Sequence, residues 1–157
     1  MGPAEKTLNV GTYRQKTNYT CGPGALKLIL DFYGRNFSEK ILTKIAGTNK
    51  KQGTSHEGLA FVLNKLGYKW VQKEFASIKD IEFFIRKKIP VLVDYQSWHG
   101  GHYSVIRGYT RTHFLLSDTA KNCGYRTIRK DLFYKRWYDT GHLKGLNYHR
   151  WMLVVLP

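Results

Sequence analysis

The sequence predicts an α+β fold in which N-terminal helices pack on a mainly antiparallel β-sheet. Two observations support this prediction. In the first half of the chain, apolar residues recur at the spacing of an amphipathic helix, whereas from Pro90 onward they form runs typical of strands. The second half also holds two such runs joined by a short turn around Thr110–Thr112, as in a hairpin. With 157 residues and no internal repeat, the chain fits a single domain over residues 1–157.

Four helices are expected before residue 90, and the first is the best defined. Ala25–Tyr33 places apolar residues at helical spacing, Gly34 ends the run, and Pro23 suits the first turn because its missing N–H is not needed there. Cys21 therefore lies at a helix N-terminus. The other three are expected from Ser38 to near Gly47, from about Ser55 to Gly67, and from Ser77, with Asp80 as a capping-box partner, to the residues before Ile89.

Strands dominate the second half of the chain. A loop over Trp98–Gly101 separates the first two, and a helix from Lys130 to about Asp139 follows the fourth. The expected strands are Pro90–Tyr95, His102–Tyr109, His113–Asp118, Tyr125–Ile128 and Trp151–Leu156.

The chain is strongly basic, with 26 Lys and Arg against 11 Asp and Glu and a formal charge of +15. Such a charge favours acidic partners, through a phosphate-binding surface or through electrostatic steering. The basic residues are spread along the whole chain, however, and no nucleic-acid-binding motif occurs among them. Nucleic acid is therefore not expected as the main partner, and a solvated lysine-rich surface is the simpler alternative.

No apolar run approaches the roughly 18 to 20 residues that span a bilayer, and Met1–Val10 lacks the pattern of a signal peptide. A cytoplasmic protein is expected, although a fragment of a larger membrane protein would look the same. Two cysteines, Cys21 and Cys123, are too few for a disulfide scaffold, but one bridge between them remains an alternative. The sequence leaves the oligomeric state open.

Cys21 is the first candidate for chemistry. A thiol attacks as the thiolate, and the N–H groups and dipole at a helix N-terminus favour that anion. Gly22 beside it removes side-chain bulk, so that a substrate carbonyl could come close. Gln15, six residues upstream, could join the Cys21 backbone N–H in an oxyanion hole. Taken alone, Cys21 fits a small buried core residue even better than a nucleophile.

A histidine and a carboxylate in the predicted hairpin change this balance. His102 follows Gly100–Gly101 at the start of one strand, and Asp118 ends the next strand. The start of one hairpin strand lies beside the end of the other, so we expect these two side chains to be neighbours. The carboxylate would then hold the imidazole in one tautomer, as in a catalytic triad. Asp94 or Asn122 could replace Asp118 as the orienting residue.

Several segments together resemble the C39 peptidases and C39-like domains. They follow one another in the same order from about Gln15 to Asp118, which is most of the chain: Gln15–Leu26, Tyr33-Gly34, Gly53–Ser55, Gly101–Tyr109 and Ser117-Asp118. The resemblance implies a papain-like fold and a Cys-His-Asp triad. In this triad Cys21 is the nucleophile, His102 the base and acid, and Asp118 the orienting carboxylate, while Gln15 is the oxyanion-hole donor.

The resemblance implies a cysteine peptidase that hydrolyses a peptide bond through an acyl-thioester on Cys21, without a cofactor. The expected partner is a peptide or protein substrate. Many members are domains of ABC exporters that cut leader peptides after Gly-Gly, so leader-peptide processing and an exporter as partner are open expectations. Two alternatives remain. One is acyl transfer on the same triad, in which an amine or thiol replaces water, and the other is a peptide-binding module with a spent site.

Metal binding is not expected. His99 and His102, with Cys21 or Cys123, lack the spacing of known metal motifs. Trp98 and His99, next to the glycine pair, could form a flap over the cleft, with ordinary loop packing as the alternative. The remaining histidines are expected as surface or packing residues: His56, His113, His142 and His149.

Overall fold

A computed structural model describes residues 2–98, 100–120, 124–140 and 148–157 of the protein. The helices are α1 (Cys21–Phe32), α2 (Glu39–Ala46), α3 (His56–Lys65), α4 (Ile78–Arg86) and α5 (Lys130–Arg136). The strands are β1 (Lys6–Thr7), β2 (Trp70–Lys73), β3 (Val91–Ser97), β4 (Gly100–Tyr109), β5 (His113–Ser117), β6 (Tyr125–Arg129), β7 (Tyr138–Asp139), β8 (Tyr148–His149) and β9 (Met152–Val155). This order confirms the predicted α+β class, with helices first and strands later.

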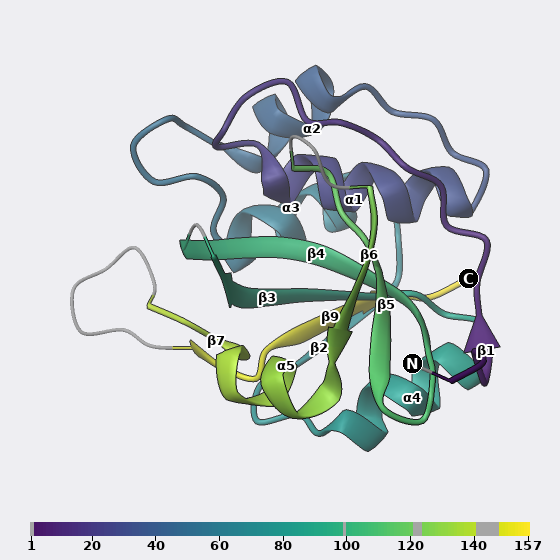
Figure 1. The fold of residues 1–157 in the computed structure, drawn as a ribbon. Coiled ribbons are helices and arrows are strands. Elements are labelled where there is room, and N and C mark those ends of the chain that lie inside the picture. Colours follow the sequence, from purple (N-terminus) through teal and green to yellow (C-terminus); the bar gives the residue numbers. More distant parts are fainter. Residues whose placement is uncertain (1, 99, 121–123, 141–147) are drawn as a thin grey trace.

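One antiparallel sheet runs through the middle of the molecule (Figure 1). Its strand order is β2-β9-β3-β4-β5-β6, and β1 pairs with β4 off this path. The longest register joins β3 to β4, from Val91 opposite Ile106 to Ser97 opposite Gly100. β7 and β8 form a separate two-stranded ribbon. The predicted hairpin is present as β4 and β5, with His102 in β4 and Asp118 directly after the last residue of β5.

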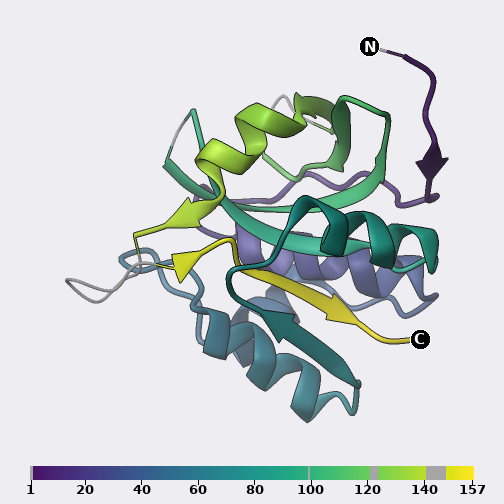
Figure 2. The ribbon, with the colours of Figure 1, turned by 90° about the horizontal axis from the view of Figure 1, so that it is seen from below.

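Helices cover both faces of this sheet, as Figures 1 and 2 show. α1 packs on β3 and β4 and is contacted by α2 and α3, whereas α4 and α5 lie on the opposite face. Apolar side chains fill both interfaces. Fully buried members include Leu26, Ile29 and Leu30 of α1, Val91, Val93 and Val105 of the central strands, and Phe133 of α5. The sheet therefore fixes the position of the α1 N-terminus relative to the strands that carry His102 and Asp118.

Serine caps start three of the helices where the sequence predicts them. The hydroxyls of Ser38, Ser55 and Ser77 accept hydrogen bonds from backbone N–H groups in the first turns of α2, α3 and α4. At α4 the Ser77 N–H in turn donates to the Asp80 carboxylate, which completes the predicted capping box. These bonds satisfy donors that a helix start otherwise leaves open.

Three details of the prediction are wrong. The helix from Lys130 ends at Arg136, because Trp137 leaves helical geometry and the next two residues pair as β7 with β8. Gly100 and Gly101 belong to β4, opposite Ser97 and Gln96, so the expected loop is shorter. The short strands β1, β2, β7 and β8 carry no clear apolar alternation and were not predicted. No helix among the described residues is both long and apolar enough to cross a bilayer.

Candidate active site

Cys21 is the first residue of α1 and is a free cysteine, half-buried at the edge of the core. The side chain of the N-cap residue Thr20 bonds Thr17 instead of capping the helix, so it does not compete for the N–H groups of the first turn. A Cβ on Gly22 would lie 2.8 Å from the Cβ of Thr54. Glycine at this position therefore allows the α1 N-terminus to approach the segment before α3. The other cysteine, Cys123, lies outside the described residues.

His102 and Asp118 are direct neighbours, as the hairpin argument predicts. His102 Nε2 lies 2.7 Å from Asp118 Oδ1, and the Asp118 side chain is fully buried. The same carboxylate accepts hydrogen bonds from the Ala120 N–H at 3.0 Å and the Ser104 hydroxyl at 3.3 Å, with Arg126 at 3.6 Å. These contacts hold the carboxylate in one orientation, and the carboxylate in turn holds the ring.

The electrostatics of this pair favour a charged imidazole. Burial alone would lower the pKa of His102, but hydrogen bonds with Asp118 and with Cys21, and their charges, raise it from 6.5 to about 10. Burial alone would raise the pKa of Asp118, but the hydrogen bond and charge of His102 outweigh it and lower the value. At neutral pH the pair therefore exists as imidazolium and carboxylate, with the thiol of Cys21 in hydrogen-bond contact with the ring.

Gln15 lies on the segment that leads into α1 and is tied to Thr119. Its backbone N–H donates to the Thr119 carbonyl at 2.8 Å, and its side-chain oxygen accepts from the Thr119 hydroxyl at 3.0 Å. Its amide nitrogen donates to the Thr17 carbonyl at 2.8 Å. An amide nitrogen carries two hydrogens, so one remains for a ligand in the cleft. Thr119 follows Asp118 directly, so one loop anchors both candidate residues.

Three of the four candidate residues, Gln15, Cys21 and His102, border one cleft with a volume of about 1140 Å³, and the buried Asp118 contacts it through His102. The lining comprises Arg14, Gln15, Lys16, Thr17, Asn18, Cys21, Ser97, Trp98, Gly101, His102, Ala120, Tyr125 and Arg126. Trp98 is 61% exposed, and the guanidinium carbon of Arg136 lies 3.8 Å from the centroid of the Trp98 ring. The expected flap over the cleft involves His99 as well, which lies outside the described residues.

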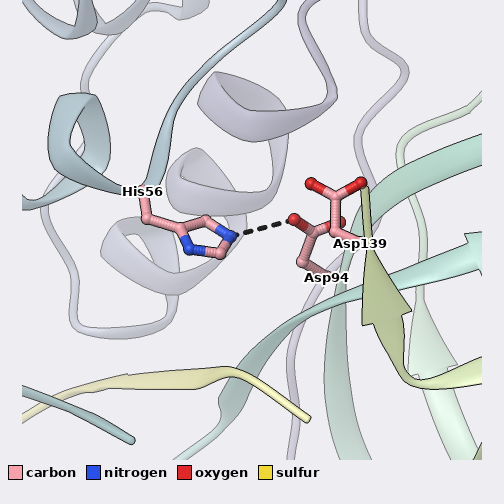
Figure 3. Close-up of side chains that lie close together, drawn as sticks. All are labelled: His56, Asp94 and Asp139. Carbon is pink, nitrogen blue, oxygen red and sulfur yellow. Dashed lines mark hydrogen bonds and ion pairs between the residues drawn. The ribbon is translucent and has the colours of Figure 1, made fainter. Parts of the chain in front are cut away.

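A second cluster of titratable groups lies behind this cleft. His56, at the start of α3, points its Nε2 at the Asp94 carboxylate on β3, 2.9 Å away, and Asp139 on β7 lies against that carboxylate (Figure 3). Burial, the charge and hydrogen bond of Asp139, and the charge of Cys21 raise the pKa of Asp94 well above its usual value. His56 stacks on Trp151, with centroids 3.8 Å apart, so it is one of the predicted packing histidines.

This cluster bears on the choice of the orienting residue and on metal binding. Asp94 bonds His56 and not His102, whereas Asp118 lies at hydrogen-bond distance from His102. Asn122 lies outside the described residues. One nitrogen of His56 and carboxylate oxygens of Asp94 and Asp139 all lie within 4.8 Å of one another, and this donor set could hold a divalent cation. A proton shared between the two carboxyl groups satisfies the same geometry. Only tertiary structure brings the three residues together, so no local sequence pattern could have predicted this cluster.

Solved structures similar to this chain share its fold. The peptidase domain of Streptococcus ComA, described as a bi-functional ABC transporter involved in a quorum-sensing pathway, matches with a TM-score of 0.77 and 19% identity over 95% of this chain and 99% of that domain. A putative C39-like peptidase from Bacillus anthracis matches with a TM-score of 0.73 and 15% identity over 98% of both chains. A double-glycine motif protease from an AMS/PCAT transporter, solved with its leader peptide, also has a TM-score of 0.73, at 16% identity over 98% of this chain and 95% of that one. These matches confirm the expected papain-like fold.

Sequence comparison identifies the family. Uncharacterized proteins of Methanothermobacter marburgensis and Methanothermobacter thermautotrophicus are 31% and 30% identical over 124 and 119 residues. These alignments span 78% and 76% of this chain and 79% and 77% of the two relatives. The model of the Peptidase_C39 like family matches residues 7–144. With a papain-like fold and a match over most of its length, the chain belongs to the Peptidase_C39 like family.

Proposed function

We propose that this protein is a cysteine peptidase that forms an acyl-thioester on Cys21, acting as one domain over residues 1–157. The observation that supports it most directly is the His102–Asp118 pair, held at 2.7 Å and in contact with a thiol at the first residue of α1. A helix N-terminus and an imidazolium both favour a thiolate. Two independent sources of positive potential thus converge on one sulfur.

The proposed reaction starts with attack of the Cys21 sulfur on the carbonyl carbon of the scissile peptide bond. Because Nε2 of His102 is held by Asp118, Nδ1 is the ring nitrogen left for the thiol and for the leaving amine. The Cys21 N–H and the second amide hydrogen of Gln15 would stabilise the oxyanion. His102 then gives its proton to the amine, takes one from water, and the water oxygen displaces the thiolate to release the acid.

Leader peptides are the substrates that the comparisons suggest. The AMS/PCAT protease was solved with a leader peptide, and the ComA domain belongs to an ABC transporter. We therefore propose a leader sequence with a double-glycine end as the first substrate to test here, and an ABC exporter as the partner to look for. The peptide-binding alternative would use the same cleft without turnover.

The test is selective alkylation of Cys21 combined with cleavage of a peptide library. In a Cys123→Ser background only one thiol remains, so iodoacetamide uptake measured by mass spectrometry reports on Cys21 alone. We expect fast alkylation at neutral pH, peptide cleavage in the Cys123→Ser chain, and no cleavage after Cys21→Ala, whose fold should stay intact by circular dichroism. Cleavage that persists in Cys21→Ala would disprove the nucleophile. Binding without any cleavage would favour the module.

A further inference from the structure

The cleft around Cys21 is lined by cations and by no described acidic side chain. Arg14, Lys16 and Arg126 border it, while Asp and Glu do not occur among its described lining residues. A second cavity of about 230 Å³ shares Ser97, Trp98 and Arg126 with the cleft. It adds Arg129 and Arg136 and again no acidic residue among those described. The two cavities therefore adjoin at these three shared residues, and both are basic.

These cations come from both sides of the cleft. Arg14 and Lys16 are exposed on the segment before α1, and neither side chain forms an ion pair with the described residues. Arg126 reaches in from β6 and is 29% exposed. Its charge is partly balanced by Asp118, which also serves the imidazolium of His102. Among the described residues, Asp118 is the carboxylate that pairs with cations of the cleft, so the side chains that line the cleft carry a net positive charge.

The second cavity extends this positive charge along the rim. The Arg136 guanidinium lies over the exposed Trp98 ring and donates one hydrogen bond to the Gln96 carbonyl. A guanidinium carries five N–H donors, so others are left for an approaching carboxylate. Arg129 contributes less, because Asp131 lies 2.7 Å from it. A peptide that crosses from the cleft to this cavity would pass cations on both sides and an aromatic platform between them.

We propose that this site selects acidic peptide segments, with Asp or Glu side chains close to the bond presented to Cys21. The proposal rests on the proposed function, since it names the substrate class of the same cleft. Opposite charges attract most strongly where water is partly excluded, as in a cleft, and salt screens the attraction over a Debye length of about 8 Å at physiological ionic strength. A peptide fits better than a nucleic-acid strand, because the cations surround a thiol and an imidazolium placed for acyl chemistry.

The experiment compares two alkylating reagents that differ in charge alone. In both reagents the Cys21 sulfur displaces iodide from the CH₂ carbon, which gives an S-carboxymethyl group from iodoacetate and an S-carbamoylmethyl group from iodoacetamide. Only iodoacetate carries a carboxylate. In the Cys123→Ser background, the ratio of the two rates measures the local field. His102 attracts iodoacetate in every variant, so its effect cancels when ratios are compared.

The rate ratio is compared between a variant with two cleft cations changed to Glu and a control variant with two distant lysines changed to Glu. The double variant Arg14→Glu/Lys16→Glu reverses two exposed cations of the cleft. The control variant Lys69→Glu/Lys79→Glu makes the same change in net charge at two distant exposed positions. Lys69 directly precedes β2, at an edge of the sheet, and Lys79 lies on α4. Arg126 is left intact because it also contacts Asp118. We expect the rate ratio to fall about tenfold in the cleft variant and less than about twofold in the distant one, with both differences shrinking in 0.5 M salt. Equal falls in the two variants would overturn the proposal.

Peptide binding separates this proposal from the proposed function. Labelled peptides that differ by Glu against Gln are titrated into Cys21→Ala by fluorescence anisotropy, with a short single-stranded oligonucleotide as competitor. We expect the Glu peptide to bind about tenfold more tightly and to lose this advantage in Arg14→Glu/Lys16→Glu. Slow alkylation of Cys21 by both reagents, with the Glu preference kept, would refute the peptidase and not the acidic ligand. No Glu preference, or displacement by the oligonucleotide at lower concentration than by the Glu peptide, would refute the acidic ligand.

Discussion

Replacement of Asp118 by Asn is the sharpest test of the proposed triad. The change keeps the shape of the side chain but removes the charge that faces His102 Nε2 at 2.7 Å. It also lets an amide NH₂ point at the ring, which would reverse the direction of the hydrogen bond and favour the wrong tautomer. The sulfur and the imidazole both remain, so turnover should fall without being abolished.

The magnitude follows from the electrostatics of the pair. The Asp118 hydrogen bond is the largest of the effects that raise the pKa of His102 to about 10. A carboxylate beside a positive group commonly shifts a pKa by about 1–3 units, so the variant ring should lose its proton that much earlier. In a serine-protease triad the same substitution lowers kcat about 10⁴-fold. A cysteine site already contains an ion pair, and we expect a loss of about 10- to 1,000-fold in kcat/KM, or roughly 1.4–4 kcal/mol.

The assay measures kcat/KM on the best peptide from the library, in parallel with Asp131→Asn and Asp94→Asn. Asp131 is exposed on α5 and controls for the loss of one negative charge. Asp94 lies behind the cleft and bonds His56, so its substitution should be milder than that of Asp118. Unchanged kcat/KM in a folded Asp118→Asn, or a larger loss in Asp94→Asn, would refute the assignment of Asp118 as the orienting residue.

Two further predictions concern pH and packing. The His102 ring should keep its proton until about pH 10. Because this folded-state pKa lies above the unfolded value of 6.5, the stabilisation of the fold by the protonated ring should be complete below pH 6.5 and lost as the pH rises toward 10. An NMR titration midpoint near 6.5 would contradict the ion pair with Asp118. In Gly22→Ala the new Cβ would lie 2.8 Å from the Thr54 Cβ, and this clash should destabilise the fold by about 1–3 kcal/mol. The higher helix propensity of alanine should offset up to about 1 kcal/mol of this loss. Gly11→Ala, which meets nothing within 4 Å, should change the urea midpoint little, and equal effects in both variants would rule out the packing argument.

Local signals explain why the larger elements could be predicted. The caps at Ser38, Ser55 and Ser77 and the apolar spacing of α1 are written in short stretches of sequence. The short strands could not be found this way. β2, for example, is mostly exposed and exists because it pairs with β9, more than 75 residues away in the chain. Such strands depend on the completed sheet and not on their own residues.

In the candidate site, too, some contacts could be predicted from local sequence and others could not. The hairpin predicts that His102 and Asp118 lie close together, since His102 lies in β4 and Asp118 directly follows the adjacent strand β5. The cluster of His56, Asp94 and Asp139 comes from α3, β3 and β7, and no local pattern links these segments. Sequence reasoning therefore finds residues joined by one turn and misses those joined only by the packing of distant elements.

Even the predicted pair depends on a detail that the sequence does not reveal. Gly108 pairs with Leu115, but Ile106 pairs with Leu116, so a bulge at Arg107 shifts the register of β4 and β5 by one residue. Beyond the bulge the register places Asp118 opposite Ser104, and their side chains are 3.3 Å apart. Ser104 and His102 lie two residues apart and face the same side of the strand. Without the bulge, Asp118 would face the other side of the sheet, because a slip of one residue exchanges the two faces.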